Sequence, residues 1–156
     1  MDEVIRQFLN ESVSLELNIG DLYQLFSVKF PMDYNFWWKL SIEEMNHAAI
    51  IRSINDVFLS ENILPVDSIG NQTEELKNMN TFIRDRVEQY KLGSITRIEA
   101  FKFAYDIENS IGESHFELFM TAKPNSTVVK IFQKLNGDDI NHAKRMDSYM
   151  IENEII

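Results

Sequence analysis

Two short motifs in this chain of 156 residues place a carboxylate three positions before a histidine, as Glu44-x-x-His47 and Asp139-x-x-His142. In each case an alanine follows. Side chains three positions apart lie on one face of an α-helix, so both members of a pair can reach the same ion. Two of the three histidines in the chain are used in this way. The motifs therefore predict helices that carry metal ligands.

Apolar residues with helical spacing surround both motifs. In residues 32–61 and again in residues 126–156, apolar side chains recur every three or four positions, and each motif interrupts one of these stripes. Such a stripe is the inward face of a helix in a bundle. Because an unpaired acid on an apolar face costs free energy, we expect these acids to be paired with cations. The apolar members are Trp37, Leu40, Ile51, Ile54 and Phe58 in the first stripe and Val128, Phe132, Leu135, Met146 and Tyr149 in the second.

Helix is predicted for nearly the whole chain. It has only five Gly and three Pro and no run of alternating β-branched residues, so strands are not expected. A loop is expected at residues 62–70, which contain Pro65 and Gly70. The predicted helices cover residues 2–29, 32–61 and 71–92, then a segment that begins near Thr96 and ends before Pro124, and finally residues from about 126 to the C-terminus.

Local signals set several of the predicted helix ends. Asn71 with Glu74 and Thr96 with Glu99 have the spacing of a capping box, in which two side chains satisfy the free N–H groups of a first turn. The helix that Asn71 opens is rich in charge, and we expect it to pack on the outside. Asn136-Gly137 is a common turn signal. The apolar stripe keeps its phase across this pair, so a continuous helix is predicted there.

The chain contains an internal repeat. A shift of 92 residues aligns Glu16 with Glu108, and a shift of 95 residues aligns the first carboxylate-x-x-histidine motif with the second. Each half is therefore predicted to be a helical hairpin. We expect one domain over residues 1–156, an all-α antiparallel four-helix bundle whose long crossover contains an extra helix. Two such hairpins related by a pseudo-twofold axis would bring six ligands to one centre: Glu16, Glu44, His47, Glu108, Asp139 and His142.

The type of ligand limits the choice of metal. Four carboxylates and two imidazoles suit two divalent iron or manganese ions, because the two dications offset the four anions. The chain has no cysteine, which excludes disulfides, zinc fingers, iron–sulfur clusters and thiol catalysis. We therefore expect two iron ions, two manganese ions or a mixed pair.

Composition argues against several classes of partner. The formal net charge of −10 disfavours binding to nucleic acid or to anionic membranes. The N-terminus lacks the basic start and apolar run of a signal peptide, and no apolar stretch is long enough to span a bilayer. A cytoplasmic location is therefore expected.

These motifs give the chain a resemblance to a known family. The helix from Glu16 to Tyr23, the two carboxylate-x-x-histidine-alanine motifs and the extra helix before the third bundle helix resemble the rubrerythrin-like branch of the ferritin-like superfamily, over nearly the whole chain. The resemblance implies a four-helix bundle in which the same six residues bind two metal ions. It also implies that the usual metal is iron and that the site reacts with dioxygen or peroxide.

Three features depart from that family. Asp139 stands where the family usually has Glu, which leaves open a lower position, a weaker affinity or a different ion for one metal. The cysteine-bound iron of full rubrerythrins is absent, so electrons would have to come from an external donor. Rubrerythrins also have a further Glu one turn after the first ligand of the third helix. Ile111 stands at that position here, so the site is more similar to the symmetric bacterioferritin type.

Three functions are compatible with this site. The leading hypothesis is an oxidoreductase that reduces peroxide or dioxygen with electrons from an external partner. The second is an iron-binding or storage protein with a ferroxidase site, and the third is a structural or regulatory bundle that metal only stabilises. The sequence does not decide whether the chain is an enzyme. Trp37 and Trp38 are expected in the core or at the contact of a homodimer.

Several neighbours of the six ligands have open roles. Tyr23 lies two turns from Glu16 and is either a hydrogen-bond partner of a ligand carboxylate or an ordinary core tyrosine. His115 holds the equivalent position in the second half, and a core role is favoured for it over a ligand role. Four acids are either neighbours that orient the ligands or solvated residues, and two glycines provide either space beside a carboxylate or close helix contact. These are Glu43, Asp138, Asp21 and Glu113, with Gly20 and Gly112.

Overall fold

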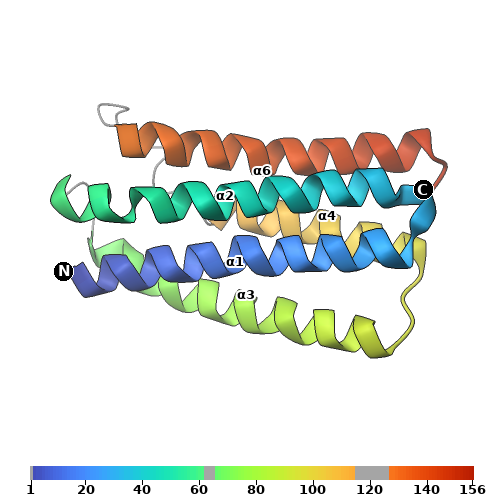
Figure 1. Cartoon of the computed structure of the whole chain (residues 1–156), viewed down its shortest axis with the longest axis horizontal. Helices are drawn as coiled ribbons and strands as arrows, with labels where there is room; N and C mark the ends of the chain where they lie inside the picture. Colours follow the sequence, from blue (N-terminus) through green and yellow to red (C-terminus); the bar gives the residue numbers. More distant parts are fainter. Residues whose placement is uncertain (1, 62–65, 115–126) are drawn as a thin grey trace. The chain divides into compact units, whose positions relative to one another are not determined.

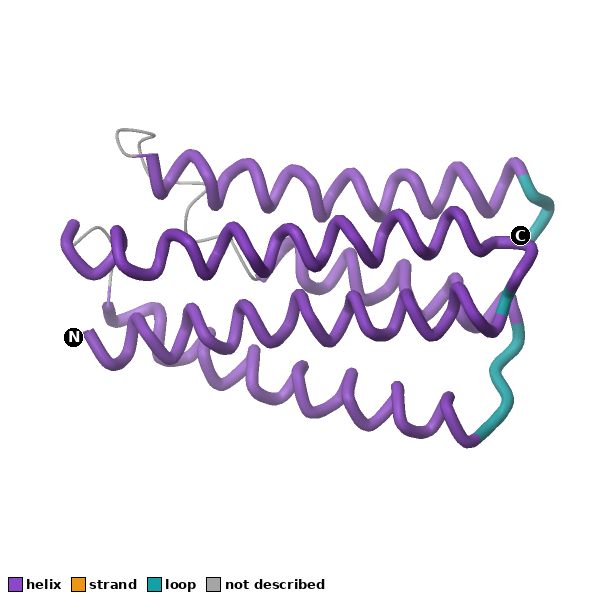
Figure 2. Tube along the Cα trace, viewed as in Figure 1, coloured by secondary structure: helices purple, strands orange, loops and turns teal. Residues whose placement is uncertain are grey.

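The computed structural model describes residues 2–61, 66–114 and 127–156. These residues form only helices, joined by short connections, and no strand occurs among them (Figures 1 and 2). The predicted all-α class is confirmed for this part of the chain. The elements in chain order are α1 (Asp2–Lys29), the 3-10 turn η1 (Pro31–Asp33), α2 (Tyr34–Glu61), α3 (Val66–Leu92), α4 (Arg97–Ser114) and α6 (Thr127–Glu152).

The chain divides into two compact units, Met1–Gly93 and Ser94–Ile156. Each unit contains one of the two hairpins that the internal repeat predicts. The N-terminal unit holds α1, α2 and α3, and the C-terminal unit holds α4 and α6. Among the described residues, none of the helices combines the length and the apolar composition that crossing a membrane would need.

In the N-terminal unit, α1 packs against both α2 and α3. Helices α1 and α2 run antiparallel because the chain reverses at η1 (Figure 1). Pro31 cannot donate a backbone hydrogen bond, so α1 ends just before it, where Phe30 N donates to Phe26 O over 2.9 Å. The end of this hairpin is closed by aromatic rings. The Trp37 ring lies 5.1 Å from that of Phe26 and 5.5 Å from that of Tyr23, and all three are fully buried.

Helix α3 begins at Val66, so the predictions of a loop through residue 70 and of a capping box at Asn71 were wrong. Ile69 is fully buried, and Thr73 Oγ1 donates to its carbonyl over 2.8 Å, as in a helix interior. Burial of Ile69 stabilises the first turns by roughly 1.5–3 kcal/mol, which outweighs the cost of about 1 kcal/mol for Gly70. The buried face of α3 runs through Ile69, Thr73, Leu76, Asn80, Ile83 and Val87.

A buried amide group fixes how α3 lies against α1. Asn80 Nδ2 donates to Glu11 Oε2 over 2.8 Å and to Glu11 O over 3.0 Å, while Asn18 Nδ2 donates to Asn80 Oδ1 over 2.8 Å. Asn80 is 2% exposed, so a shift along the helix axis would leave its amide without these partners inside the protein. The extra helix therefore has a defined register on α1.

In the C-terminal unit, α4 and α6 pack against each other and run antiparallel (Figure 1). The capping box at the start of α4 is confirmed: Thr96 N donates to Glu99 Oε2 over 2.8 Å, and Glu99 N donates to Thr96 Oγ1 over 3.2 Å. Helix α6 continues through Asn136 and Gly137, as predicted. The predicted end of the preceding helix near Pro124 lies outside the described residues.

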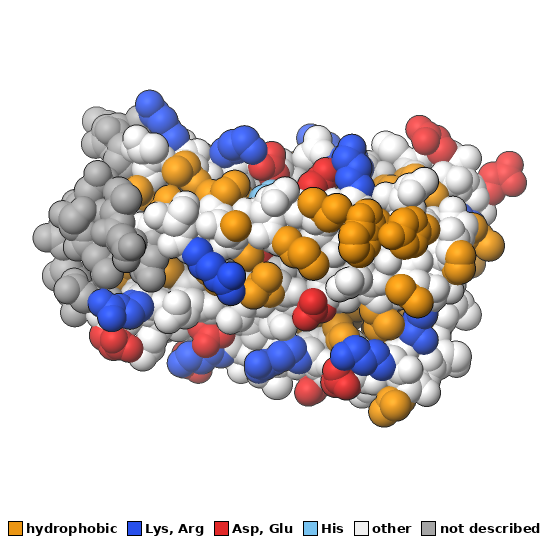
Figure 3. All heavy atoms as spheres, viewed as in Figure 1, with side chains coloured by type: hydrophobic (Ala, Val, Ile, Leu, Met, Phe, Trp, Pro, Cys, Tyr) orange, Lys and Arg blue, Asp and Glu red, His pale blue; other side chains and the backbone are white. Residues whose placement is uncertain are grey.

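The two adjacent tryptophans have different environments. Trp37 is fully buried, whereas Trp38 is 36% exposed and its ring stacks on that of Tyr34 at 5.9 Å. Trp38 belongs to an exposed apolar stripe on α2, where apolar side chains gather on the surface (Figure 3). Trp37 is thus a core residue, while a dimer contact through the stripe stays a prediction. The stripe consists of Tyr34, Trp38, Ile42 and Met45.

Candidate metal centre

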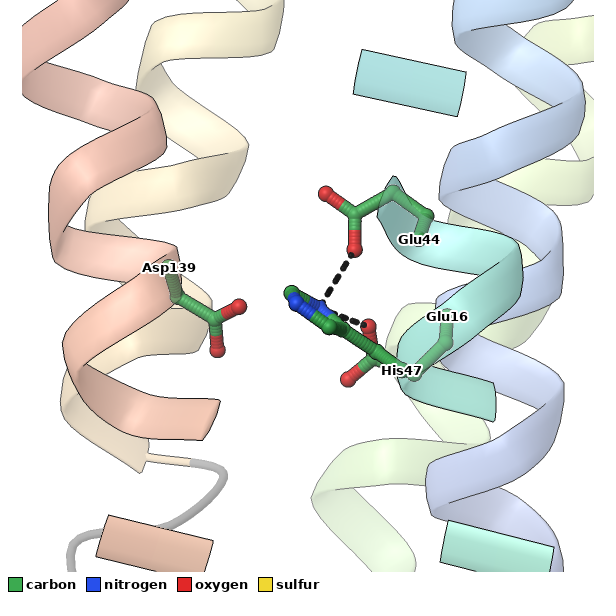
Figure 4. A group of neighbouring side chains, drawn as sticks. All are labelled: Glu16, Glu44, His47 and Asp139. Atoms are coloured by element: carbon green, nitrogen blue, oxygen red, sulfur yellow. Dashed lines mark ion pairs between the residues drawn. The ribbon is translucent and has the colours of Figure 1, made fainter. Parts of the chain in front are cut away.

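The N-terminal unit brings together the three ligands predicted for its hairpin. Glu16 on α1 and Glu44 and His47 on α2 are each at most 5% exposed. His47 Nδ1 lies 3.4 Å from Glu16 Oε2 and 3.3 Å from Glu44 Oε2 (Figure 4). One ligand atom of each residue lies within 4.8 Å of those of the other two. This buried cluster could hold a metal ion.

Close packing of α1 and α2 supports this cluster. A Cβ atom on Gly20 would lie 3.4 Å from Ser41 O and 3.5 Å from Glu44 Cβ. These are ordinary van der Waals distances, so Gly20 lies at the contact between α1 and α2, next to the Glu44 side chain, and an alanine would fit there. Of the two roles considered for this glycine, the structure shows the close helix contact. The surroundings of Gly112, its counterpart in the repeat, lie outside the described part of the chain.

The two carboxylates control the protonation of His47. Burial of the ring opposes protonation, but hydrogen bonding and charge from Glu16 and Glu44 outweigh it and raise the pKa of His47 from 6.5 to about 10. The imidazole of the metal-free protein is therefore protonated at neutral pH. A metal ion must displace this proton, because only a neutral imidazole can be a ligand. In the metal-free protein, the proton on His47 offsets part of the negative charge of Glu16 and Glu44 that a bound cation would otherwise neutralise.

The C-terminal unit repeats part of this arrangement, in a smaller cluster formed by Glu108 and His142. Glu108 on α4 and Asp139 and His142 on α6 are each 2% exposed. His142 Nδ1 lies 3.6 Å from Glu108 Oε2. In both units, therefore, the Nδ1 atom of a buried histidine faces a glutamate on the other helix of its hairpin. Asp139, also drawn in Figure 4, takes the place in the motif that Glu44 has in the first hairpin.

The charges of the N-terminal cluster match one divalent cation. It contains two carboxylates and one imidazole, so it carries two negative charges when the histidine is neutral. Burying two unpaired carboxylates is unfavourable, whereas a dication or a protonated histidine offsets them. All six predicted ligands are buried, which argues against an ordinary solvated acidic surface. That all six converge on one centre stays a prediction.

The structure shows the surroundings of some of the residues that neighbour the predicted ligands. Tyr23 is fully buried with its ring against Trp37, so it belongs to the core, while a hydrogen bond from its hydroxyl to a ligand stays a prediction. Asp138 Oδ2 forms an ion pair with Lys134 Nζ at 2.6 Å near the surface. This agrees with a solvated role for Asp138. Asp21 is exposed, and Glu43 is half-buried. His115 and the side chain of Glu113 lie outside the described residues.

Sequence reasoning missed a cavity that borders the C-terminal cluster. It has a volume of about 380 Å³, lies between α4 and α6, and includes Glu108 in its wall. Its other polar wall residues include Asn109 and Lys144, which are residue types that are common on the exposed faces of helices. Only their position beside a buried carboxylate sets them apart, and no motif marks that position.

Comparison of the chain with protein-family models, with curated proteins and with solved structures gave no significant match. The fold and the two clusters define an all-α protein with buried carboxylate and histidine groups that could hold a metal ion.

Proposed function

We propose that this protein is a di-metal carboxylate protein, with iron as its metal, that reduces peroxide or dioxygen with electrons from an external donor. The observation that carries the proposal is the repeated arrangement of a buried histidine that faces a glutamate in each hairpin. His47 faces Glu16 at 3.4 Å, and His142 faces Glu108 at 3.6 Å. The internal repeat and the resemblance to rubrerythrin-like proteins support a shared centre for both clusters.

The ligand set supports iron over softer or larger ions. Oxygen and imidazole nitrogen ligands suit divalent iron or manganese, and the chain has no thiolate that would favour zinc or copper(I). Two dications would balance the four carboxylates of the two clusters. The shorter side chain of Asp139 predicts that the second position differs from the first in affinity or in the ion that it takes.

The protein's own residues would bind the ions and control their surroundings. Glu16, Glu44 and His47 would hold one ion, and Glu108, Asp139 and His142 the other. A reduced iron pair supplies two electrons to an oxidant when it is bound. His47 would give up its proton on binding, and the apolar faces around the N-terminal cluster would exclude bulk water. With no cysteine-bound iron in the chain, electrons would come from a partner.

Elemental analysis of protein purified without added metal tests the proposal. We expect about two iron atoms per chain, as in other di-metal carboxylate bundles. Glu44→Ala and His142→Ala should each lower the metal content while circular dichroism shows unchanged helix, because loss of an acid or a ligand also relieves crowding of charge. Asp139→Ala and its neighbour Asp138→Ala form a matched pair. Only Asp139→Ala should lose metal, and equal metal content in both would mean that the site is misplaced.

Two further measurements separate the alternative functions. Stopped-flow mixing of the ferrous protein with peroxide should give fast oxidation, whereas a bundle that metal only stabilises would show none. Size-exclusion chromatography distinguishes an iron store, which needs a large multi-subunit shell, from a monomer or dimer. We expect fast oxidation and a small assembly.

A further inference from the structure

The cavity between α4 and α6 reaches one of the proposed ligands from outside the helix pair. Its volume is about 380 Å³. Helix α4 contributes Tyr105, Glu108 and Asn109 to its wall, and α6 contributes Ala143 together with residues nearer the rim. Glu108 is 2% exposed, yet it lines this cavity, so the cavity ends at a buried carboxylate.

The cavity wall combines oxygen-bearing side chains with the apolar side chains of Ile140 and Ala143. Glu108 and Asp147 contribute carboxylates, Tyr105 a hydroxyl and Asn109 an amide. Asn109 Nδ2 donates to Tyr105 O over 2.9 Å, and its carbonyl oxygen is the atom of this amide that can accept or coordinate. Oxygen ligands of this kind suit hard divalent cations. Lys144 is the one basic residue among those that line the cavity.

The cavity is large enough for a hydrated ion. A water molecule takes up about 30 Å³ in the liquid, so a dication with six waters needs roughly 180 Å³. The cavity has about twice that volume. An ion could therefore reach Glu108 before it exchanges its waters for protein ligands.

The first hairpin has a different surface at the equivalent positions. By the repeat, Tyr105 and Asn109 correspond to Val13 and Leu17, which are apolar. The position of Lys144 corresponds to Ala49. A Cβ atom on Gly20 would lie 3.7 Å from Met45 Cγ, so the Met45 side chain lies over the contact between α1 and α2. The polar wall is thus a property of the second hairpin, and the repeat alone does not account for it.

From these observations we infer that the cavity between α4 and α6 is the route by which a hydrated divalent cation reaches Glu108 and loads the C-terminal cluster. The inference rests on the proposed function, because it assumes that this cluster binds a metal ion. Asp147 at the exposed rim attracts the cation, and Lys144 opposes its approach. Ala143 keeps the path open because its side chain is small.

Uptake of Co²⁺ by metal-free protein, followed by stopped-flow absorbance, tests this route. Ala143→Leu places a larger side chain in the cavity wall and should slow uptake about tenfold or more, while the final Co²⁺ content stays that of the wild type. Ala49→Leu makes the same change at an exposed position on α2 and should leave the rate unchanged. Uptake by Ala143→Leu at the wild-type rate would overturn the inference.

A second pair of variants changes only exposed side chains. Asp147 and Asp106 are both exposed, but only Asp147 lines the cavity. At 0.1 M salt, Asp147→Lys should slow Co²⁺ uptake several-fold. Asp106→Lys should slow it less, because Asp106 does not line the cavity and charge effects fade beyond a Debye length of about 10 Å at this salt concentration. Equal rates for these two variants would also contradict the route.

The outcomes distinguish the route from the function. If the wild-type protein takes up no Co²⁺, the proposed function and the route both fail. If the wild type binds Co²⁺ and the cavity variants load at its rate, only the route fails.

Discussion

A proton and a metal ion compete for His47. Its Nδ1 atom lies 3.3 Å and 3.4 Å from two carboxylates, and its pKa is raised to about 10. Because one pKa unit corresponds to about 1.4 kcal/mol, removal of this proton at pH 7 costs roughly 4 kcal/mol of the binding free energy. The affinity of the N-terminal cluster for a divalent ion should therefore rise about tenfold for each pH unit between 7 and 9. About one proton should be released per ion bound there.

Calorimetric titration of metal-free protein with Zn²⁺ measures both quantities. Titrations at pH 7 and pH 8, each in two buffers with different ionisation enthalpies, give the affinity and the number of protons released. His47→Gln has no imidazole to deprotonate, so it should bind more weakly and release about one proton fewer. An affinity that is the same at pH 7 and pH 8, with no released proton, would refute this account of the cluster.

The same raised pKa predicts the pH dependence of the metal-free fold. A group whose pKa is higher in the folded state stabilises that state fully below its unfolded pKa of about 6.5 and loses this contribution as the pH rises through about 10. The metal-free protein should therefore melt at a lower temperature at pH 10.5 than at pH 7. Glu16→Gln should reduce this difference, because it removes one of the two carboxylates that raise the pKa.

Substitutions at three further positions test the packing of the helices. Gly20→Ala should be neutral or should stabilise the protein by up to about 1 kcal/mol in urea unfolding, since a Cβ atom fits at 3.4 Å from Ser41 O. Gly20→Leu should displace the Glu44 side chain and weaken metal binding. Asn80→Ala should destabilise the protein by about 1–3 kcal/mol in the same assay, because it removes the hydrogen bonds that the buried Asn80 amide makes with part-buried partners on α1. Thr96→Ala removes the hydroxyl that accepts a hydrogen bond from Glu99 N, so it should lower the midpoint of thermal unfolding. An unchanged midpoint would show that this cap does not stabilise the fold.

Local rules predicted most of the helices because their signals lie within a few residues of one another. Pro31 ends α1, and the reciprocal bonds of Thr96 and Glu99 open α4. The start of α3 could not be predicted in this way. It depends on burial of Ile69, a tertiary contact that overrides the turn tendency of Gly70.

The candidate site was predictable to the extent that it interrupts an apolar pattern. The burial of Glu44 and His47 follows from their place in the stripe of α2, and the repeat extends the same reasoning to Asp139 and His142. Interatomic distances, the protonation of His47 and the cavity beside Glu108 depend on how neighbouring helices pack. No periodicity encodes those properties.

The capping box of α4 completes the first turn of the second hairpin without a residue from the chain that precedes it. Thr96 and Glu99 satisfy the first turn of α4 with groups from that same turn, so no residue of the N-terminal unit is needed there. A cut between Gly93 and Thr96 would leave each fragment with two acids and one histidine of the proposed centre. If the proposed function is correct, the two fragments should reassemble when ferrous iron is added and separate again under a chelator. The chain would then serve as a split protein whose joining reports the presence of a metal.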